Sequence, residues 1–205
     1  MGEKEHVSLL FSKTTLGLEA GCDEAGRGCL AGPVVAAAVI LGVPIPGLND
    51  SKKLVQRQRE TLRTEIERTA IAFAVAYVSP QRIDEINILN ASIEAMHQAL
   101  SNLQVDPKHI LVDGNRFRPF RGISHDCIVG GDARYQSIAA ASILAKTYRD
   151  EYMAQLDQQF PQYGWKTNQG YPTKTHVKAL TLHGITRFHR KTYSPVQKAL
   201  QSELF

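Results

Sequence analysis

The sequence predicts an α/β domain with a mixed β-sheet, followed by a helical C-terminal part. Short apolar runs rich in Val, Ile and Ala recur along the first 130 residues, as expected for buried strands. Apolar residues at helical spacing lie between the later runs. After residue 158 the pattern is helical only. Strands that come first and then alternate with helices indicate an α/β domain.

Each element follows from local signals. The loop Gly42–Asp50 is rich in Pro and Gly, and Asp50 or Ser51 can cap the helix after it. Ser79-Pro80 places a cap before a proline at the first helical position, and an interruption is expected near Asn87–Asn90. In chain order we expect strands at 15–22, 34–41, 71–78, 109–112 and 127–129, and helices at 50/51–69, 80–103, 135–159, 173–183 and from 194, with a loop at 161–172.

Composition limits the class of protein. The chain has 205 residues, of which 43% are hydrophobic and 21% charged, which fits one globular domain and excludes a disordered or fibrous chain. The uncharged stretch from Gly28 to Asn49 is broken by Gly and Pro, and its continuous apolar part, Val34–Leu41, is too short to cross a bilayer. The first six residues, Met1–His6, are charged and lack an apolar run, so we do not expect them to be a signal peptide. We therefore expect a soluble, cytoplasmic protein without a membrane partner.

The cysteines do not form a recognisable framework. Cys22, Cys29 and Cys127 are an odd number without CxxC spacing, which argues against a disulfide scaffold or a structural zinc site. We expect all three to be small buried apolar side chains.

Charge is divided unevenly along the chain. Residues 1–157 hold 17 basic and 19 acidic side chains, whereas residues 158–205 hold 7 basic and 1 acidic. We expect a domain at 1–157 with a basic helical segment at 158–205 packed on it. A basic segment suits phosphate binding, and the alternative is an ordinary solvated surface.

Four acidic residues come at the ends of predicted strands, each close to a glycine: Asp23, Glu24, Asp113 and Asp132. Each alone could form a turn or cap a helix. Together they favour a site for hard cations such as Mg²⁺ or Mn²⁺, and two metals about 4 Å apart can hydrolyse a phosphodiester. Because consecutive strand residues point to opposite faces, Asp23 and Glu24 can share a site only if the strand ends or bulges there.

Six motifs resemble those of the ribonuclease HII family, in the same order, from about Glu19 to Val196. Any one of them alone would be weak, whereas six in order are specific. They are Gly21–Gly28 (GCDEAGRG), Leu48–Leu54 (LNDSKKL), Leu111–Asn115 (LVDGN), Gly130–Asp132 (GGD), Ser137–Lys146 (SIAAASILAK) and Gly170–His176 (GYPTKTH). One departure is Thr192-Tyr193 after His189-Arg190, where members of the family commonly have Ser-Phe.

The resemblance implies a ribonuclease H-like fold with a helical C-terminal subdomain. It implies an endonuclease that cuts the RNA strand of RNA–DNA hybrids and incises 5′ of single ribonucleotides in duplex DNA, leaving 3′-hydroxyl and 5′-phosphate ends. Such an enzyme would act in ribonucleotide excision repair and DNA replication. It further implies that Asp23, Glu24, Asp113 and Asp132 are catalytic and hold two Mn²⁺ or Mg²⁺ ions.

The same resemblance implies how the sugar is recognised. Gly26 and Gly28, with Arg27 between them, let backbone groups approach a ribose, and the 2′-hydroxyl is what separates RNA from DNA. Together with Tyr171, this loop would sense the 2′-hydroxyl and the following deoxyribose. Without the family, Tyr171 would be interpreted as a loop-packing residue.

Motif positions also suggest three phosphate contacts: Lys53, Ser137 and Lys146. A lone lysine on a helix is usually solvated, and Ser137 could equally cap or pack a helix.

The histidines of the C-terminal part are not spaced as the ligands of a zinc site would be. We expect His176, His183 and His189 to lie at the surface or face phosphate, and Tyr163 and Trp165 to be hydrophobic anchors.

Two other functions are considered. A nucleic-acid-binding module with an inactive site would keep the basic segment, but four intact acids argue against it. Another member of the fold, such as an integrase-like enzyme or an exonuclease, is disfavoured by the Gly-Arg-Gly and Gly-Tyr-Pro-Thr elements. Expected partners are RNA–DNA hybrid and ribonucleotide-containing duplex DNA, and we expect a monomer.

Overall fold

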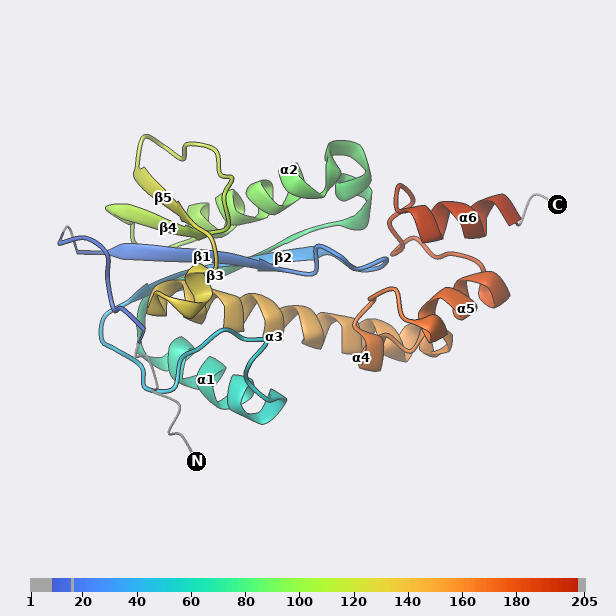
Figure 1. The fold of residues 1–205 in the computed structure, drawn as a ribbon, viewed down its shortest axis with the longest axis horizontal. Coiled ribbons are helices and arrows are strands. Elements are labelled where there is room, and N and C mark those ends of the chain that lie inside the picture. Colours follow the sequence, from blue (N-terminus) through green and yellow to red (C-terminus); the bar gives the residue numbers. More distant parts are fainter. Residues whose placement is uncertain (1–8, 16, 203–205) are drawn as a thin grey trace, which may run out of the picture. The chain divides into compact units, whose positions relative to one another are not determined.

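The computed structural model describes residues 9–15 and 17–202. Five strands form one mixed sheet in the order β3-β2-β1-β4-β5 (Figure 1). Two of the neighbouring pairs, β1 with β4 and β4 with β5, are parallel. The strands are β1 (Glu19–Ala25), β2 (Val34–Leu41), β3 (Ala70–Val78), β4 (His109–Asp113) and β5 (Ser124–Ile128). The predicted α/β class with a mixed sheet is confirmed.

Helices separate and follow the strands. They are α1 (Gln56–Thr69), α2 (Pro80–Ser101), α3 (Gln136–Gln159), α4 (Trp165–Asn168), α5 (Lys174–His183) and α6 (Ser194–Ser202), with 3₁₀ turns η1 at Gly131–Ala133 and η2 at Pro161–Tyr163. Ser79 caps α2 by accepting a hydrogen bond from the Arg82 amide, and the helix is interrupted at Asn87, where φ is 66°, as expected from the sequence.

The chain forms two compact units. The first comprises Met1–Asp23, Ala38–Phe73 and Leu103–Ile143, and the second comprises Glu24–Ala37, Ala74–Asn102 and Leu144–Phe205. The division at residue 157 remains a prediction, and each unit is described separately below.

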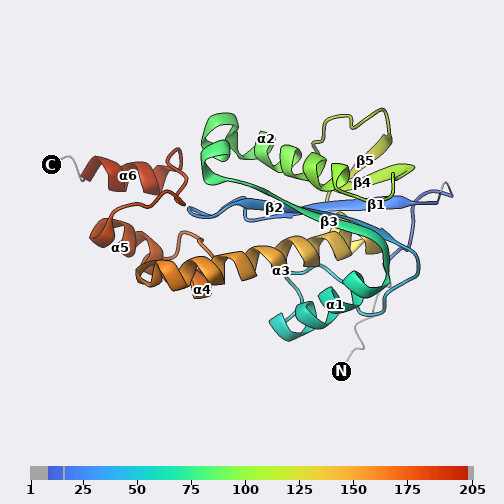
Figure 2. The same cartoon turned by 180° about the vertical axis from the view of Figure 1, so that it is seen from behind.

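In the first unit, α1 and the first turns of α3 lie on the same side of the strands (Figures 1 and 2). Helix α3 approaches β1 closely at Gly21, where a Cβ atom would stand 2.1 Å from the carbonyl carbon of Ser137. Leu111, Ile128 and Ile138 form a small apolar cluster between β4, β5 and α3. These contacts hold the strand ends that carry Asp23 and Asp113.

In the second unit, α2 and the rest of α3 lie on opposite sides of the strand segments (Figures 1 and 2). Trp165 and Tyr163 are buried and their rings stack with centroids 5.0 Å apart, so their prediction as hydrophobic anchors is confirmed. They belong to a core cluster that includes Leu30, Met153 and Leu180.

Several boundaries differ from the sequence expectation, among them β5, which spans Ser124–Ile128 rather than residues 127–129. The first strand begins at Glu19 rather than Thr15, because its pairing with β4 starts there (Leu16 lies outside the described residues). The helix expected from Asp50 or Ser51 begins at Gln56, because residues 50–53 form a turn in which the Lys53 amide donates to the Asp50 carbonyl at 2.9 Å. The expected loop at 161–172 contains η2 and α4.

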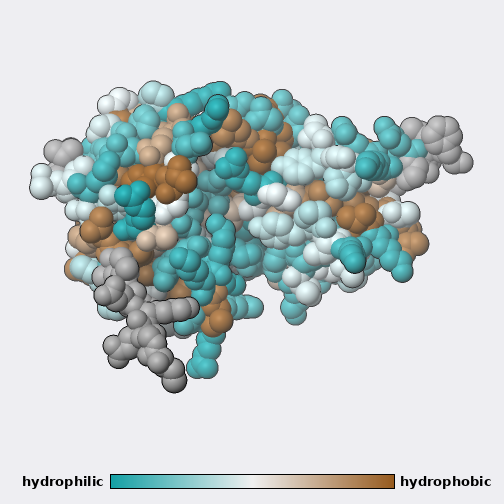
Figure 3. Space-filling model, viewed as in Figure 1, coloured by the Kyte–Doolittle hydropathy of each residue, from teal (hydrophilic) through white to brown (hydrophobic). Residues whose placement is uncertain are grey.

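The prediction for the cysteines is correct for two of them. Cys22 and Cys29 are buried, whereas Cys127 is exposed, because it lies on β5 at the edge of the sheet. On the face shown in Figure 3, hydrophilic residues predominate and hydrophobic residues gather in separate patches. Among the described residues, no helix has the length and apolar character needed to cross a membrane.

Candidate active site

Three of the predicted catalytic acids lie in the first unit. Asp23 is on β1, Asp113 ends β4, and Asp132 lies in η1 just after β5. Since β1, β4 and β5 are parallel neighbours, their carboxyl ends meet at one edge, where α/β sheets bind ligands. Asp23 and Asp132 are only 6% and 5% exposed, and Asp113 accepts a 2.7 Å hydrogen bond from the Gly131 amide.

Like charges accumulate around Asp132. Burial raises the pKa of Asp132, and the negative charges of Asp50 and Asp113 raise it further, to about 6, although Lys52 opposes this. Asp50 was not among the predicted ligands. Its position in the turn after the Pro/Gly loop brings a further carboxylate beside Asp132.

Lys52 provides a positive charge to this group of acids. Burial alone would lower its pKa, but the surrounding carboxylates outweigh burial and raise it. The carboxylates are those of Asp132, Asp50, Asp23 and Asp113. The predicted phosphate contact, Lys53, is the next residue of the same turn and is exposed.

The chemistry of these residues fits a divalent cation. The donors are carboxylate oxygens, which Mg²⁺ and Mn²⁺ prefer, and a cation would offset the repulsion that raises the pKa of Asp132. Within residues 9–15 and 17–202, no three Asp, Glu, His or Cys side chains already form a group that could hold a metal ion. The acids therefore supply the donor types and the charge, while the metal-holding arrangement stays a prediction.

Glu24 belongs to the second unit. The parallel ladder of β1 with β4 runs from Glu19 opposite His109 to Cys22 opposite Val112, so Glu24 lies beyond it. Its side chain is 9% exposed and pairs with Arg27 at 3.1 Å. Glu24 thus draws the arginine of the Gly-Arg-Gly loop toward the strand end.

The second unit brings the Gly-Arg-Gly loop and Tyr171 together. A Cβ atom at Gly28 would lie 3.9 Å from the Cε1 atom of Tyr171, and the Leu30 amide donates to the Gly170 carbonyl at 2.7 Å. Gly26 has φ of 95°, a conformation that favours glycine. Tyr171 remains 43% exposed, so its ring is accessible beside the loop.

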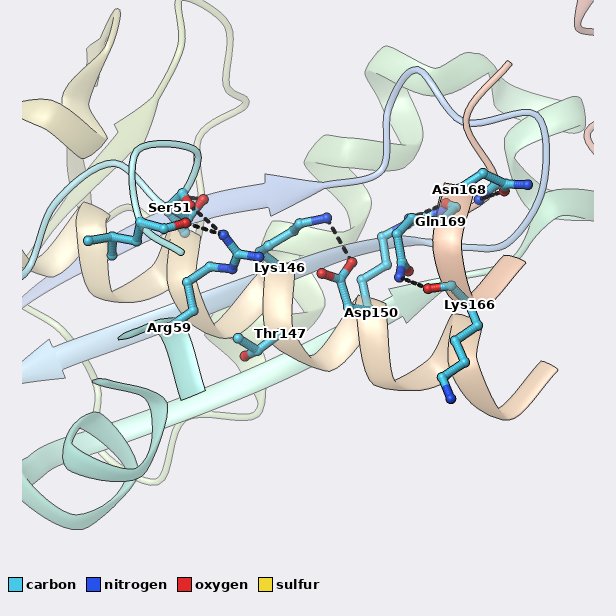
Figure 4. Close-up of polar contacts among 12 residues, drawn as sticks. Ser51, Arg59, Lys146, Thr147, Asp150, Lys166, Asn168 and Gln169 are labelled. Atoms are coloured by element: carbon cyan, nitrogen blue, oxygen red, sulfur yellow. Dashed lines mark hydrogen bonds and ion pairs between the residues drawn. The ribbon is translucent and has the colours of Figure 1, made fainter. Parts of the chain in front are cut away.

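The two remaining predicted phosphate contacts, Lys146 and Ser137, differ in their surroundings. Lys146 points to Asp150 and pairs with it at 2.8 Å in the second unit (Figure 4). In the first unit, the buried hydroxyl of Ser137 has no hydrogen-bond partner within the described residues. Ser142, one helical turn and a half further along α3, bonds to Ser51 of the 50–53 turn at 2.8 Å.

Two histidines expected at the surface or facing phosphate are buried, which corrects the sequence interpretation for His176 and His189. Because the Thr186 amide donates to Nδ1 of His189 at 2.9 Å, the proton of His189 lies on Nε2 and is donated to Nε2 of His176 at 3.2 Å. Nε2 of His176 also accepts a hydrogen bond from Nε1 of Trp165 at 3.0 Å. Nδ1 of His176 then donates to the Tyr171 carbonyl at 2.9 Å.

These two histidines predict a pH dependence of stability. Burial lowers the pKa of His176 and lowers that of His189 to about 3, so the folded protein keeps both rings neutral at pH values where an unfolded His, with a pKa of about 6.5, is protonated. The unfolded state therefore binds more protons, and stability falls as pH drops below about 6.5.

We expect the melting temperature of the Asp132→Asn variant to decrease as the pH is lowered from 7.5 to 5. This variant is used because the raised pKa of Asp132 would contribute the opposite slope. A melting temperature that is constant over this range would contradict the conclusion that His176 and His189 stay neutral in the folded protein.

Two buried arginines were missed by the sequence analysis. Arg149 of α3 donates to the carbonyls of Ala31, Pro33 and Gln169, at 3.0, 3.0 and 2.8 Å. Arg190 donates to the carbonyls around the Gly-Arg-Gly loop. No local signal distinguishes them from the other arginines of the chain, because their burial depends on segments distant in sequence.

Comparisons with known proteins agree with the motifs. The family model described as Ribonuclease HII matches residues 20–196. A curated ribonuclease HII from Christiangramia forsetii is 59% identical over 176 residues, which cover 85% of this chain and 89% of the relative.

Solved structures show the same fold. The ribonuclease H2 of Pyrococcus horikoshii is similar with a TM-score of 0.76 and 28% identity, over 90% of this chain and 97% of that one. The fold is also shared with a complex of Bst-RNase HIII with Mn²⁺, at a TM-score of 0.64 and 20% identity, over 92% of this chain and 71% of the other.

Proposed function

Since the chain belongs to the ribonuclease HII family and is a ribonuclease H endonuclease, we propose that it incises duplex DNA on the 5′ side of a single embedded ribonucleotide as well as cutting RNA–DNA hybrids. The products would be 3′-hydroxyl and 5′-phosphate ends. The observation that carries the proposal is the set of acids around Lys52 at the strand ends of the first unit.

The roles of the acids follow from their environment. Asp23, Asp113 and Asp132, together with Glu24, are proposed to hold the divalent metal, Mn²⁺ or Mg²⁺. When bound, the two metal ions would activate a water and stabilise the leaving oxygen. The carboxylates of Asp23, Asp113 and Asp132 lie at the same edge of the sheet, and the Asp113–Gly131 hydrogen bond orients one of them.

Recognition of the ribose is assigned to the second unit. The backbone of Gly26, Arg27 and Gly28 can approach a 2′-hydroxyl closely, and the exposed ring of Tyr171 beside Gly28 can pack on the next sugar. Lys53, Ser137 and Lys146 are proposed phosphate contacts. To bind a phosphate, the Lys146 ammonium group would have to leave its ion pair with Asp150.

The basic segment 158–205 is proposed to hold the nucleic-acid backbone, and residues 1–157 to form the catalytic domain. We further propose that the protein acts as a cytoplasmic monomer in ribonucleotide excision repair and DNA replication. The basic excess of the segment, 7 basic to 1 acidic residue, supports backbone binding.

A labelled-duplex assay tests the function. A 5′-labelled DNA duplex with one ribonucleotide is incubated with the protein and Mg²⁺ or Mn²⁺, beside an all-DNA duplex and an RNA–DNA hybrid. We expect one product that ends 5′ of the ribonucleotide, no cutting of the all-DNA duplex, and complete loss of cutting after EDTA, because the acids without metal cannot activate water. Cutting of the all-DNA duplex, or cutting that resists EDTA, would refute the proposal.

Tyr171→Ala is expected to reduce cutting of the single-ribonucleotide duplex by about tenfold or more, with a smaller effect on the long hybrid. Burial of a large apolar side chain is worth about 1.5–3 kcal/mol, which is about tenfold or more in rate, and a duplex with one ribonucleotide offers only one correctly placed junction. Rates on the two substrates are compared for the variant and the original protein. An equal loss on both would indicate a general structural role for Tyr171.

A further inference from the structure

The turn formed by residues 186–193 contacts both proposed sugar-reading elements of the second unit. On one side, His189 reaches the Tyr171 carbonyl through His176. On the other side, Arg190 and Tyr193 reach the Gly-Arg-Gly loop. Backbone hydrogen bonds add to this: the Arg190 amide donates to the Leu30 carbonyl at 2.8 Å.

Arg190 is completely buried and donates its N–H groups to backbone carbonyls. Nη2 donates to Gly26 at 2.7 Å, Nη1 to Arg27 at 2.8 Å, and Nε to Gly32 at 3.1 Å. A buried guanidinium is costly unless its donors are satisfied, so these carbonyls and the guanidinium hold one another in place. The planar, forked geometry of Arg allows three carbonyls to be held at once.

The hydroxyl of Tyr193 adds a further bond to the same loop. It donates to the Arg27 carbonyl at 2.8 Å and accepts from Nη1 of Arg190 at 3.1 Å. A phenylalanine at this position would lack the hydroxyl. Where members of the family commonly have Ser-Phe, this chain has Thr192-Tyr193. Tyr193 therefore makes a hydrogen bond to the loop that a phenylalanine could not make.

The turn is itself anchored to α2. Asp84 accepts hydrogen bonds from the Lys191 amide at 2.8 Å, the Thr192 amide at 3.0 Å and the Thr192 hydroxyl at 2.6 Å. The position of Arg190 and Tyr193 is thus defined by an element that does not belong to the loop they hold.

We propose that Arg190 and Tyr193 are positioning residues that fix the Gly26-Arg27-Gly28 loop and thereby set the preference for a ribonucleotide over a deoxyribonucleotide. Two glycines in three residues leave the free loop flexible, and reading a single hydroxyl requires backbone groups at a defined distance. This inference rests on the proposed sugar-reading role of the loop.

The test compares Arg190→Lys and Tyr193→Phe with the matched control Arg68→Lys, in the last turn of α1, where the side chain of Arg68 is 68% exposed. For each, kcat and KM are measured on the single-ribonucleotide duplex and on the long hybrid. Affinity for ribonucleotide-containing and all-DNA duplexes is measured in EDTA, and folding is followed by the melting temperature.

We expect Arg190→Lys to lower the ratio of kcat/KM between the single-ribonucleotide duplex and the hybrid about tenfold, because lysine keeps the charge but cannot hold three carbonyls. The hybrid has a 2′-hydroxyl at every RNA position, so a displaced loop costs less there. Tyr193→Phe should lower the ratio about two- to fivefold with an unchanged melting temperature, since only one hydrogen bond is lost. The ratio of affinities for ribonucleotide-containing and all-DNA duplexes should fall in parallel, and Arg68→Lys should change neither ratio.

Wild-type ratios in Tyr193→Phe and in a folded Arg190→Lys would overturn the proposal, as would an equal loss on both substrates. If Arg190→Lys does not fold, Tyr193→Phe decides. If the original protein does not cut the single-ribonucleotide duplex, the proposed function fails, and the affinity ratios in EDTA still decide whether these residues control ribose recognition.

Discussion

Asp23→Asn and Asp132→Asn are each expected to abolish cutting, with a loss of about a thousandfold or more, while binding of RNA–DNA hybrid survives. Each change removes one negative charge from the proposed metal site. A bound metal stabilises the transition state by several kcal/mol, and a loss of about 4 kcal/mol lowers the rate about a thousandfold. Single-turnover cutting with Mg²⁺ or Mn²⁺ and a separate binding measurement check the result.

The matched control is Asp106→Asn, whose side chain is 83% exposed and lies 3.9 Å from Arg121. It should cut at the original rate. In the metal-free protein, Asp132→Asn should not lower the melting temperature at neutral pH, because Asp132 is repelled by Asp50 and Asp113. Cutting that persists undiminished in both active-site variants would exclude these acids as metal ligands.

Gly21→Ala is expected to destabilise the protein by about 3 kcal/mol or more. The new Cβ would stand 2.1 Å from the carbonyl carbon of Ser137 and 2.3 Å from the Ile138 amide, and both are backbone atoms of α3 that cannot rotate away. Relief requires α3 to move from β1, and overpacking of this kind costs about 1–3 kcal/mol or more. Urea unfolding followed by circular dichroism measures the difference.

Gly28→Ala is the control for that experiment. Its Cβ would meet its nearest neighbour, Cε1 of Tyr171, at 3.9 Å, an ordinary van der Waals distance. The change in unfolding free energy should be within about 0.5 kcal/mol. A midpoint for Gly21→Ala equal to that of Gly28→Ala would show that the close approach of α3 to β1 is not maintained in solution.

Features governed by neighbours in the chain could be predicted from the sequence. The strand Val34–Leu41 has the expected bounds, because eight consecutive apolar residues define a buried strand without reference to its partners. Ser79-Pro80 defines the start of α2, since a cap and a proline at the first helical position act locally. The location of Asp113 and Asp132 at strand ends follows from the same local signals.

Features governed by distant segments could not be predicted. The turn at 50–53 replaced the expected start of α1 and brought Asp50 and Lys52 into the electrostatic environment of Asp132, about 80 residues away. His176 and His189 were expected at the surface or facing phosphate, but they are buried beside Trp165 and share a hydrogen bond.

The sequence by itself determined the order of strands and helices, the family motifs and the acids that end the strands, because these depend on residue type and local spacing. Only the tertiary structure decided which charges surround one another and which buried donors hold the Gly-Arg-Gly loop. Arg190 shows the reason: its partners Gly26 and Gly32 precede it by 164 and 158 residues, and such burial and pairing depend on how the whole chain folds.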